Sequence, residues 1–392
     1  MNNRAVPALN FDEGWYLSSY PDVARAISHG DFGTAVEHYL QFGSREGRLP
    51  VAPQPDNERV FVYGSFGSNN VGDEAILEGV RKIYPKCHQF YLNKRRGGSG
   101  SFPHEALMDL NFFRSGDYLI IGGGGLLYDR PTVSLMASLA KAARAAGATV
   151  DILRLGCEAA GPEYHDVIRE LFSQARYATV RSTESQRVMR DILGHDLPVE
   201  MDFAFNLRGM AREIRYQPQS DLTIGLVTAS MSPQVMEAVS NFITKQTRRR
   251  QADGMRFVHI PHSRSYFNLE NNDCLLGETI WTRAAMENAW SEDAFALWPF
   301  RQEPRDCLAD YRKLDGVIGF RYHSLIFANL CDLPTLAVGV DHKKVASFYE
   351  DHPSSLTFGA AIEELDSQFE PFLECVRELR GKRMGKAASA VA

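Results

Sequence analysis

The sequence is poor in cysteine, with six among 392 residues, and no two of them form a CxxC pair. Zinc ribbons and redox dithiols need closely spaced cysteines, so this spacing suggests neither kind of site. We therefore expect free, buried thiols at the scattered positions Cys87, Cys157, Cys274, Cys307, Cys331 and Cys375.

Long apolar runs are also missing. No segment approaches the roughly 18 apolar residues that a membrane-spanning helix needs. The start, MNNRAVPALNFDEGW, lacks the apolar core of a signal peptide. We expect a cytoplasmic protein that can associate peripherally with the inner face of a membrane and reach a membrane-bound substrate from that side.

The charges are mixed, with a formal net charge of −6 and no long run of one sign. This argues against nucleic-acid binding through bulk charge, although local basic sites remain open. With 44% hydrophobic and 23% charged residues, the composition is that of a folded protein. The length favours two domains and an appendage.

Residues 1–50 are a candidate small helical module. Apolar residues show helical spacing around Val23 and Ile27, and again around Ala35 and Tyr39, with Asp31 or Thr34 as a cap and Gly43 as a stop. The segment resembles a short module with FDxxWYLxxYPDV and HYxxxGxxEGRxP signatures that accompanies glycan-modifying enzymes. Its aromatic side chains are read as the core of this mini-domain, with sugar binding as the alternative, at Trp15, Tyr16 and Tyr39.

Residues 51–58 read as an extended linker, and short apolar runs then alternate with amphipathic stretches, as in βαβ units. We expect one Rossmann-like domain at 59–215 and another at 216–358. A terminal helix and tail follow at 359–392, with a break or kink near Pro371. The predicted fold class is α/β, with two doubly wound domains. The expected strands are RVFVYGS, HQFYLN, DYLIIGG, TVDILRLG and YATVRS, then DLTIGLVT, MRFVHIP, AFALWPF, DGVIGF and PTLAVGV.

A glycine-rich turn, YGSFGSNNVGDEAILEGV, joins the first strand to its helix at 63–80. Glycines allow close backbone approach, and free amides at the helix start favour an anion or a polar sugar edge. The motif is neither a Walker loop nor a clean GxGxxG, so its signal is weak. Asp73 is a candidate substrate-binding residue, or a first-turn charge that complements the helix dipole.

Four successive glycines end the strand DYLIIGGGG. Glycine in a strand costs conformational entropy, so the run suggests that a ligand approaches the backbone at the carboxyl end of this strand. The alternative is a tight crossover that requires positive φ. The residues are Gly122, Gly123, Gly124 and Gly125.

The segment DGVIGFRYHSLIF brings Arg321 and His323 to a strand end just as a helix begins. Two residues apart in extended geometry, they would project to the same side. The next strand is expected to end at Asp341, His342, Lys343 and Lys344. A planar guanidinium suits a carboxylate or phosphate, and histidine transfers protons near neutral pH. The two basic clusters predict an anion pocket.

Other strand-end candidates are less specific. Arg181 is read as a ligand or as an ion-paired residue at a helix entry, and Asp202 as a ligand or a cap. His259 and His262 are read as site residues or as polar groups of a turn. These histidines lack a third ligand in the sequence, so we expect no metal.

The order of these motifs resembles the polysaccharide pyruvyltransferase family over about residues 59–350. The motifs are SNNVGDE, DxxxxGGGGL, VRSxES, RYHSLIFA and LPTLAVGVDHKK. The resemblance implies a glycosyltransferase-B-like pair of domains, phosphoenolpyruvate as co-substrate, no cofactor, and a glycan or lipid-linked saccharide as acceptor.

Residue by residue, the resemblance implies donor binding by Arg321 and His323, by Lys343 or Lys344, and by Arg181. It places Asn69, Asn70, Asp73 and the glycine run on the acceptor side. His323 would supply a proton or stabilise the departing phosphate, and Asp73 would accept the proton of the acceptor hydroxyl. The expected product is a cyclic ketal on a cell-surface polysaccharide or exopolysaccharide.

Two alternatives remain open. One is a nucleotide-sugar glycosyltransferase of the same fold, since the fold does not choose the donor. Such an enzyme would need an acidic residue for the ribose, which Asp341 could supply. The other is a non-catalytic glycan-binding protein that has kept the fold.

Overall fold

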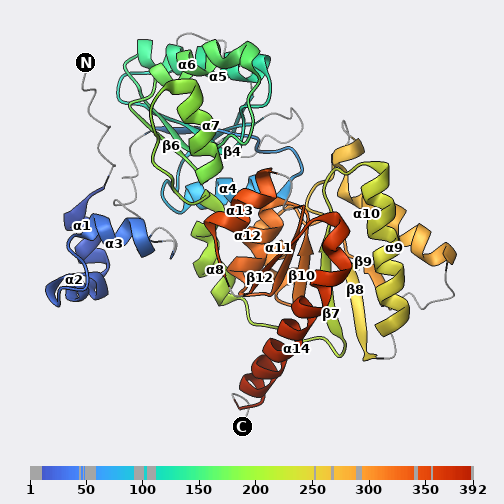
Figure 1. Ribbon diagram of the computed structural model, residues 1–392. Coiled ribbons are helices and arrows are strands. Elements are labelled where there is room, and N and C mark those ends of the chain that lie inside the picture. The colour runs from blue at the N-terminus through green and yellow to red at the C-terminus, as the bar shows by residue number, and fades with distance from the viewer. Residues whose placement is uncertain are drawn as a thin grey trace. The chain divides into compact units, whose positions relative to one another are not determined.

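The computed structural model divides into two compact units (Figure 1). The N-terminal unit comprises Met1–Ser68 and Ala75–Leu207, and the C-terminal unit comprises Asn69–Glu74 and Arg208–Ala392. The predicted linker at 51–58 lies outside the described residues, as do Asp341 and His342. The structure describes residues 11–43, 46, 48, 59–91, 101–103, 112–250, 253–265, 269–287, 294–339, 343–354 and 356–389.

Residues 11–43 form the predicted helical module. The Oγ1 atom of Thr34 accepts a hydrogen bond from the backbone N–H of Glu37 at 3.1 Å, so Thr34 is the cap. Tyr16 and Tyr39 are fully buried, which confirms their reading as core residues. The first helix was not predicted. The elements are α1 (Glu13–Ser19), α2 (Pro21–Ser28), α3 (Ala35–His38) and a π-helical turn at Tyr39–Gly43.

The N-terminal unit contains a six-stranded parallel sheet in the order β3-β2-β1-β4-β5-β6. This is the Rossmann order, in which the chain begins at the centre, moves to one edge, and returns to fill the other side. The strands are β1 (Val60–Tyr63), β2 (His88–Tyr91), β3 (Ser101–Pro103), β4 (Tyr118–Gly125), β5 (Thr149–Gly156) and β6 (Tyr177–Val180).

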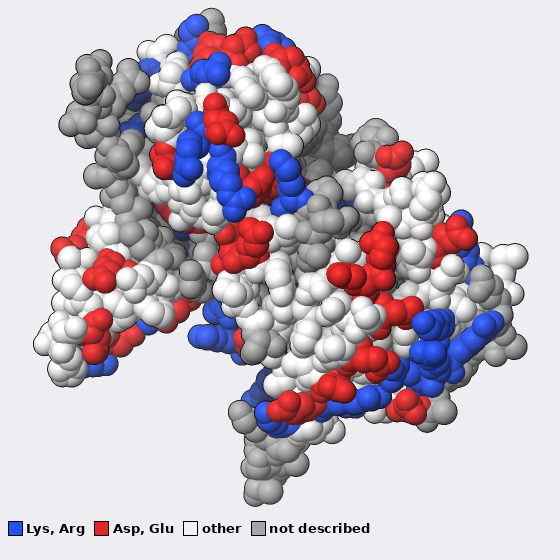
Figure 2. Space-filling view, in the orientation of Figure 1, with Lys and Arg blue, Asp and Glu red and all other residues white. Residues whose placement is uncertain are grey.

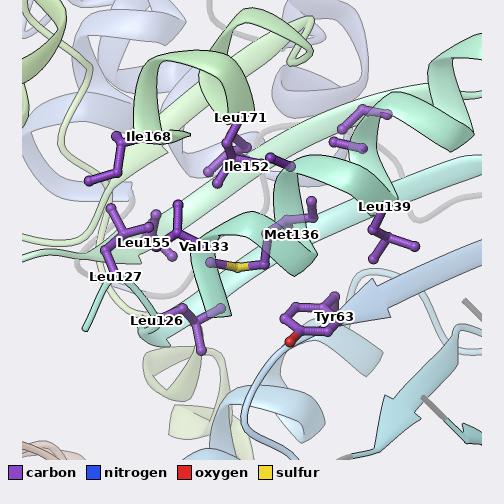
Figure 3. Close-up of a cluster of buried hydrophobic side chains, with 14 of the residues drawn as sticks. Tyr63, Leu126, Leu127, Val133, Met136, Leu139, Ile152, Leu155, Ile168 and Leu171 are labelled. Atoms are coloured by element: carbon purple, nitrogen blue, oxygen red, sulfur yellow. The ribbon is translucent and has the colours of Figure 1, made fainter. Parts of the chain in front are cut away.

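Alternate side chains of the central strands pack into two different cores. Phe61 and Leu119 join the core beneath α5, α6 and α7, part of which is drawn in Figure 3. Val62 and Ile120 join a second core with α4. Because helices cover both faces, these strands read as continuous apolar runs. The helices are α4 (Val71–Arg81), α5 (Arg130–Ala145), α6 (His165–Ser173) and α7 (Thr183–Leu193).

The C-terminal unit repeats this architecture with the strand order β12-β11-β10-β7-β8-β9. Its strands are β7 (Leu222–Val227), β8 (Met255–His259), β9 (Phe295–Leu297), β10 (Gly316–Gly319), β11 (Thr335–Val338) and β12 (Thr357–Ala360). Its helices are α8 (Arg208–Glu213), α9 (Pro233–Arg250), α10 (Asp273–Glu287), α11 (Pro304–Tyr311), α12 (Tyr322–Leu330), α13 (Lys343–Asp351) and α14 (Leu365–Ser389).

The last helix, α14, is anchored to the sheet by a buried ion pair. Arg380 pairs with Asp315, which directly precedes β10, and also donates to the carbonyl of Gln219 at 2.7 Å. Asp315 accepts a further hydrogen bond from the backbone N–H of Thr223 at 2.8 Å. The helix continues through Pro371, so the predicted break was wrong, while a kink at this residue stays a prediction.

The predicted fold class is confirmed, with two Rossmann-like sheets and a small helical module. All ten expected strands are present, while β3 and β12 were missed. Among the described residues, no helix combines the length and the apolar character needed to cross a membrane. On the face drawn in Figure 2, Lys and Arg side chains gather toward the lower right, with Asp and Glu side chains beside them.

Candidate functional site

The strongest candidate site lies at the topological switch point of the C-terminal sheet. Ligands of doubly wound folds bind beyond the carboxyl ends of the strands where the strand order reverses. Here that point lies between β7 and β10, where Gly319 is the register partner of Val227. The chain leaves β7 at Thr228 and leaves β10 toward Arg321. Arg321 therefore follows a strand end, as the sequence predicted.

Arg321 is held along one edge of its guanidinium by Asp273. The Nε atom donates to Asp273 Oδ2 at 2.8 Å, and Nη2 donates to Asp273 Oδ1 at 2.6 Å. Further bonds join Nη2 to Asn271 Oδ1 at 2.7 Å and Nε to the Thr228 carbonyl at 3.0 Å. The third nitrogen, Nη1, makes no hydrogen bond to any described residue. The protein thus fixes one side of the fork, and donor binding by Arg321 stays a prediction.

His323 lies in the first turn of α12, which begins at Tyr322. The expectation that Arg321 and His323 share one side of an extended segment was therefore wrong. Arg321 has the extended backbone of a residue that precedes a helix, with φ −106° and ψ 140°, while His323 is already helical. The imidazole packs on Gly72, where an added Cβ would come within 2.4 Å of its Nδ1 atom.

The first turn of α4 belongs to the C-terminal unit and is bound there by backbone hydrogen bonds. Val71 donates to the carbonyl of His262 at 2.9 Å, and Arg264 donates to the carbonyl of Asn69 at 2.9 Å. An isolated antiparallel bridge pairs Asn70 with Ser263. These contacts hold the SNNVGDE motif, which includes Gly72, beside the ring of His323.

The two asparagines of this motif have different structural roles. Asn70 caps α4, because its Oδ1 atom accepts from the backbone N–H of Gly72 at 3.0 Å. Asn69 is 6% exposed and has φ 58°, and its Oδ1 atom is buried without a partner among the described atoms. Asp73 is half-buried in the same first turn. Acceptor binding by the three residues stays a prediction.

His259 and His262 are buried side chains of the same unit. His259 shares a 2.9 Å hydrogen bond with Thr228 Oγ1, and His262 shares one of 2.8 Å with Tyr311 OH. Burial, helped by the positive charge of Arg321, lowers the pKa of His259 to about 3. The same causes hold the pKa of His262 well below its ordinary value. Both rings are therefore neutral near pH 7, and neither is a ready proton donor.

Lys343 and Lys344 open α13, the helix that follows β11. Lys343 is exposed and Lys344 is half-buried. β11 ends at Val338 and α13 begins at Lys343, so the prediction that the two lysines lie at the strand end was wrong. Their binding of the donor stays a prediction.

Arg181 lies in the N-terminal unit, just after β6, and is 1% exposed. Its guanidinium contacts Glu158 Oε1 at 2.7 Å and Asp202 Oδ2 at 3.2 Å. Asp202 also accepts from the backbone N–H of Ala204 at 3.0 Å. Arg181 is thus ion-paired, and donor binding by it stays a prediction.

The glycine run has a structural explanation at three of its four positions. Gly122, Gly123 and Gly124 have φ of 145°, 73° and 87°, which favours glycine at each. A Cβ at Gly122 would also come within 2.1 Å of the Leu153 carbonyl oxygen. Gly125 has neither constraint, since it is exposed and an added Cβ would meet nothing closer than 3.8 Å. A ligand that approaches this backbone would meet Gly125 first.

Comparison with known proteins decides the family. The sequence model of the polysaccharide pyruvyl transferase family matches residues 70–342, more than half of the chain. The chain belongs to the polysaccharide pyruvyl transferase family. The matched span of this pyruvyl transferase includes Asn70, Asp73, the glycine run, Arg181, Arg321 and His323, while Asn69, Lys343 and Lys344 lie just outside it.

Solved structures similar to this pyruvyl transferase show its fold. UDP-GlcNAc 2-epimerase from Methanocaldococcus jannaschii is 9% identical, with a TM-score of 0.52 over 82% of this chain and 92% of that one. Anabaena Alr3699/HepE in complex with UDP and glucose is 11% identical, with a TM-score of 0.50 over 83% and 95% of the two chains. No curated protein sequence matches the chain.

Sequence reasoning missed Asp273. The residue opens α10 and lies 48 positions before Arg321. In the sequence it reads as an ordinary acidic residue at a helix start, where it complements the helix dipole. Only the tertiary fold brings it to the guanidinium, and no local pattern would have identified it.

Proposed function

We propose that the chain transfers the pyruvate unit of phosphoenolpyruvate onto two hydroxyls of one glycan sugar, forming a cyclic ketal and releasing inorganic phosphate. The family supports a pyruvyl transferase acting on a polysaccharide. The observation that carries the proposal is the presence of an arginine and a histidine at the start of α12, at the switch point of the C-terminal sheet. Arg321 precedes α12 with its Nη1 atom open, and His323 lies in the first turn of the same helix.

The chemistry of the donor explains why these groups would be needed. Phosphoenolpyruvate carries a phosphate and a carboxylate, so its site must supply positive charge and N–H donors. A guanidinium fixed on one edge presents its remaining N–H groups in a set direction, which suits a planar carboxylate or a phosphate. The first turn of α12 adds the positive end of the helix dipole.

In the proposed reaction, the methylene carbon of the enol phosphate gains a proton and becomes a methyl group. The electron-poor C2 atom is attacked by one sugar hydroxyl. The C2–O bond to phosphate then breaks, and a second hydroxyl of the same sugar attacks C2 to close the ketal. The two hydroxyls lose two protons, of which the methyl group takes one and the phosphate the other. No metal or redox partner is needed for this balance.

The residues have distinct roles in this scheme. Arg321 binds the donor, with Lys343 or Lys344 as a second cation. His323 donates a proton to the departing phosphate or stabilises its charge. Asp73, two positions after the α4 N-terminus at Val71, accepts the proton of an attacking hydroxyl. Asn69, Asn70 and the exposed Gly125 serve the acceptor, together with Gly122, Gly123 and Gly124, and Arg181 serves the donor.

The acceptor is proposed to be a cell-surface polysaccharide, an exopolysaccharide or its lipid-linked precursor, modified on the cytoplasmic side.

Ligand-induced stabilisation gives a first test. Only a ligand that binds the native state raises the melting temperature. Phosphoenolpyruvate at millimolar concentration should raise it, and UDP- or GDP-sugars should not. Stabilisation by a nucleotide sugar, with no effect of phosphoenolpyruvate, would reject the donor assignment.

A further inference from the structure

The carboxylate of Asp273 is the centre of the hydrogen-bond network around Arg321. Its side chain is fully buried and pairs with Arg321 through both oxygens, at 2.6 and 2.8 Å. Its Oδ2 atom also accepts from the backbone N–H groups of His262 and Ser263, each at 2.9 Å. The backbone N–H of Asp273 donates in turn to the Ser263 carbonyl at 2.9 Å. One carboxylate therefore joins the start of α10, the loop after β8 and the residue before α12.

The loop that Asp273 holds also holds the first turn of α4. The carbonyl of His262 accepts from Val71 at 2.9 Å, and the N–H of Arg264 donates to Asn69 at 2.9 Å. The residue after Val71 is Gly72, against which the His323 ring packs. The contacts thus connect Asp273 to α12 in two ways. Asp273 binds Arg321, which directly precedes α12. It also binds the loop 262–264, which holds the first turn of α4 against the His323 ring of α12.

We propose that Asp273 is a positioning residue that orients Arg321 toward the donor and, through the loop 262–264, sets the first turn of α4 against His323. The part of this inference that concerns the donor rests on the proposed function. Both oxygens of Asp273 are occupied by protein donors, so Asp273 acts through Arg321 and not on the ligand. Burying an ion pair is costly and often adds little stability, whereas it fixes geometry when fully hydrogen-bonded.

The chain contains a matched control for a merely structural ion pair. Asp315 is also buried in the C-terminal unit, pairs with Arg380, and accepts from the backbone N–H of Thr223 at 2.8 Å. It directly precedes β10, whereas Arg321 follows the other end of that strand. Asp273→Asn and Asp315→Asn therefore remove the same kind of charge at opposite ends of β10.

Hydrogen exchange on the full chain tests the positioning of α4 without requiring any activity. The Asp273→Asn side chain has a single acceptor oxygen, whereas the donors from Arg321, His262 and Ser263 bind two oxygens in the wild type. We therefore expect weaker hydrogen bonds to the loop 262–264. Amide protection at Val71 and Arg264 should fall by about tenfold or more, as expected for loss of a charge-assisted hydrogen bond. In Asp315→Asn the same amides should keep their protection. Unchanged protection in Asp273→Asn, or an equal loss in both variants, would overturn the inference.

Steady-state kinetics with phosphoenolpyruvate test the orientation of Arg321. Asp273→Asn should raise the KM for phosphoenolpyruvate by about tenfold or more, while Asp315→Asn should change it by less than about twofold. In an Arg321→Lys background the Asp273→Asn change should add little, because the two residues act as a unit. A full additional effect in that background would contradict action through Arg321.

A second variant guards against a folding failure of Asp273→Asn. Asn271 accepts from Arg321 Nη2 at 2.7 Å and is only half-buried, so Asn271→Ala loosens the same guanidinium at lower cost to folding. Asn271→Ala should also raise the KM for phosphoenolpyruvate. An unchanged KM would contradict the claim that the hydrogen-bond partners of Arg321 orient it toward the donor. If the wild type does not turn over phosphoenolpyruvate, the proposed function fails, and hydrogen exchange still decides the role of Asp273 in holding α4.

Discussion

The imidazole of His323 lies directly on Gly72, so that a methyl group added to this glycine would come within 2.4 Å of Nδ1. Gly72 has no positive φ that would demand glycine, so space for the ring is what requires it. The contact joins the first turns of α4 and α12. Two motifs that lie about 250 residues apart in the sequence therefore meet at one point of the C-terminal unit.

This contact predicts the effect of Gly72→Ala. The added methyl must displace the His323 ring, which we expect to lower kcat by about 100-fold, the scale of a 1 Å misplacement of a catalytic group. Gly209→Ala is the control, because Gly209 lies in α8 with no atom within 4 Å of an added Cβ. Gly209→Ala should stabilise the chain by about 0.4–1 kcal/mol and leave kcat unchanged. Wild-type kcat in a folded Gly72→Ala protein would show that the ring position is unimportant.

Arg321→Lys keeps the charge but loses the planar fork. A lysine cannot make the paired bonds to Asp273 while presenting a further N–H group to the donor. We expect the loss of about 1.5–3 kcal/mol of donor binding, which is about a 10- to 150-fold increase in the KM for phosphoenolpyruvate. Initial rates at saturating acceptor measure it, with circular dichroism to show that the variant is folded. A KM within twofold of wild type would remove Arg321 from donor binding.

The buried histidines predict how stability depends on pH. The pKa of His259 is lowered from 6.5 to about 3, so the unfolded chain takes up a proton that the folded chain does not. The contribution of this group to the free energy of unfolding is fully present above pH 6.5. It is lost as the pH falls toward 3, by at most about 1.4 kcal/mol per pH unit. His259→Gln should make the decline shallower. Urea unfolding across this pH range measures it, and an equally steep decline in the variant would contradict the assignment.

The N-terminal module is predicted to be dispensable for the chemical step. Its core of Tyr16, Val23, Ala35 and Tyr39 is its own cluster, and the residues of the candidate site lie in other parts of the chain. Removing residues 1–58 should leave turnover on small acceptors within about twofold of wild type, while binding to long polymer weakens. The full-length protein, assayed with the same acceptors, is the control. Complete loss of turnover in a folded truncation would show that the module completes the active site.

The fold was largely predictable because buried parallel strands have a simple signature. Runs such as VFVY and YLIIGGGG are apolar on both faces, and alternation with helices fixes the α/β class. The short edge strand β12 gave no such signal, since three of its four residues are only half-buried. The position of Arg321 after β10 was likewise predictable from the sequence.

The interior of the site was less predictable. Asp273 reaches Arg321 only through the tertiary fold, and the loop 262–264 meets Asn69 and Val71 in the same way. The glycine run shows the opposite problem, because positive φ at Gly122, Gly123 and Gly124 cannot be distinguished from ligand contact in the sequence. Where α12 begins was also uncertain by a residue or two, and that shift moved His323 from a strand into a helix.

We propose that the pyruvate unit of phosphoenolpyruvate becomes a ketal on the glycan. The most direct measurement incubates the enzyme, a glycan panel and phosphoenolpyruvate in deuterated water, and analyses the product by mass spectrometry and nuclear magnetic resonance. We expect a ketal whose methyl group carries one deuterium, one phosphate released per ketal, and a rate about 100-fold or more lower in His323→Ala. Transfer of a sugar from a nucleotide sugar, with phosphoenolpyruvate left intact, would contradict it.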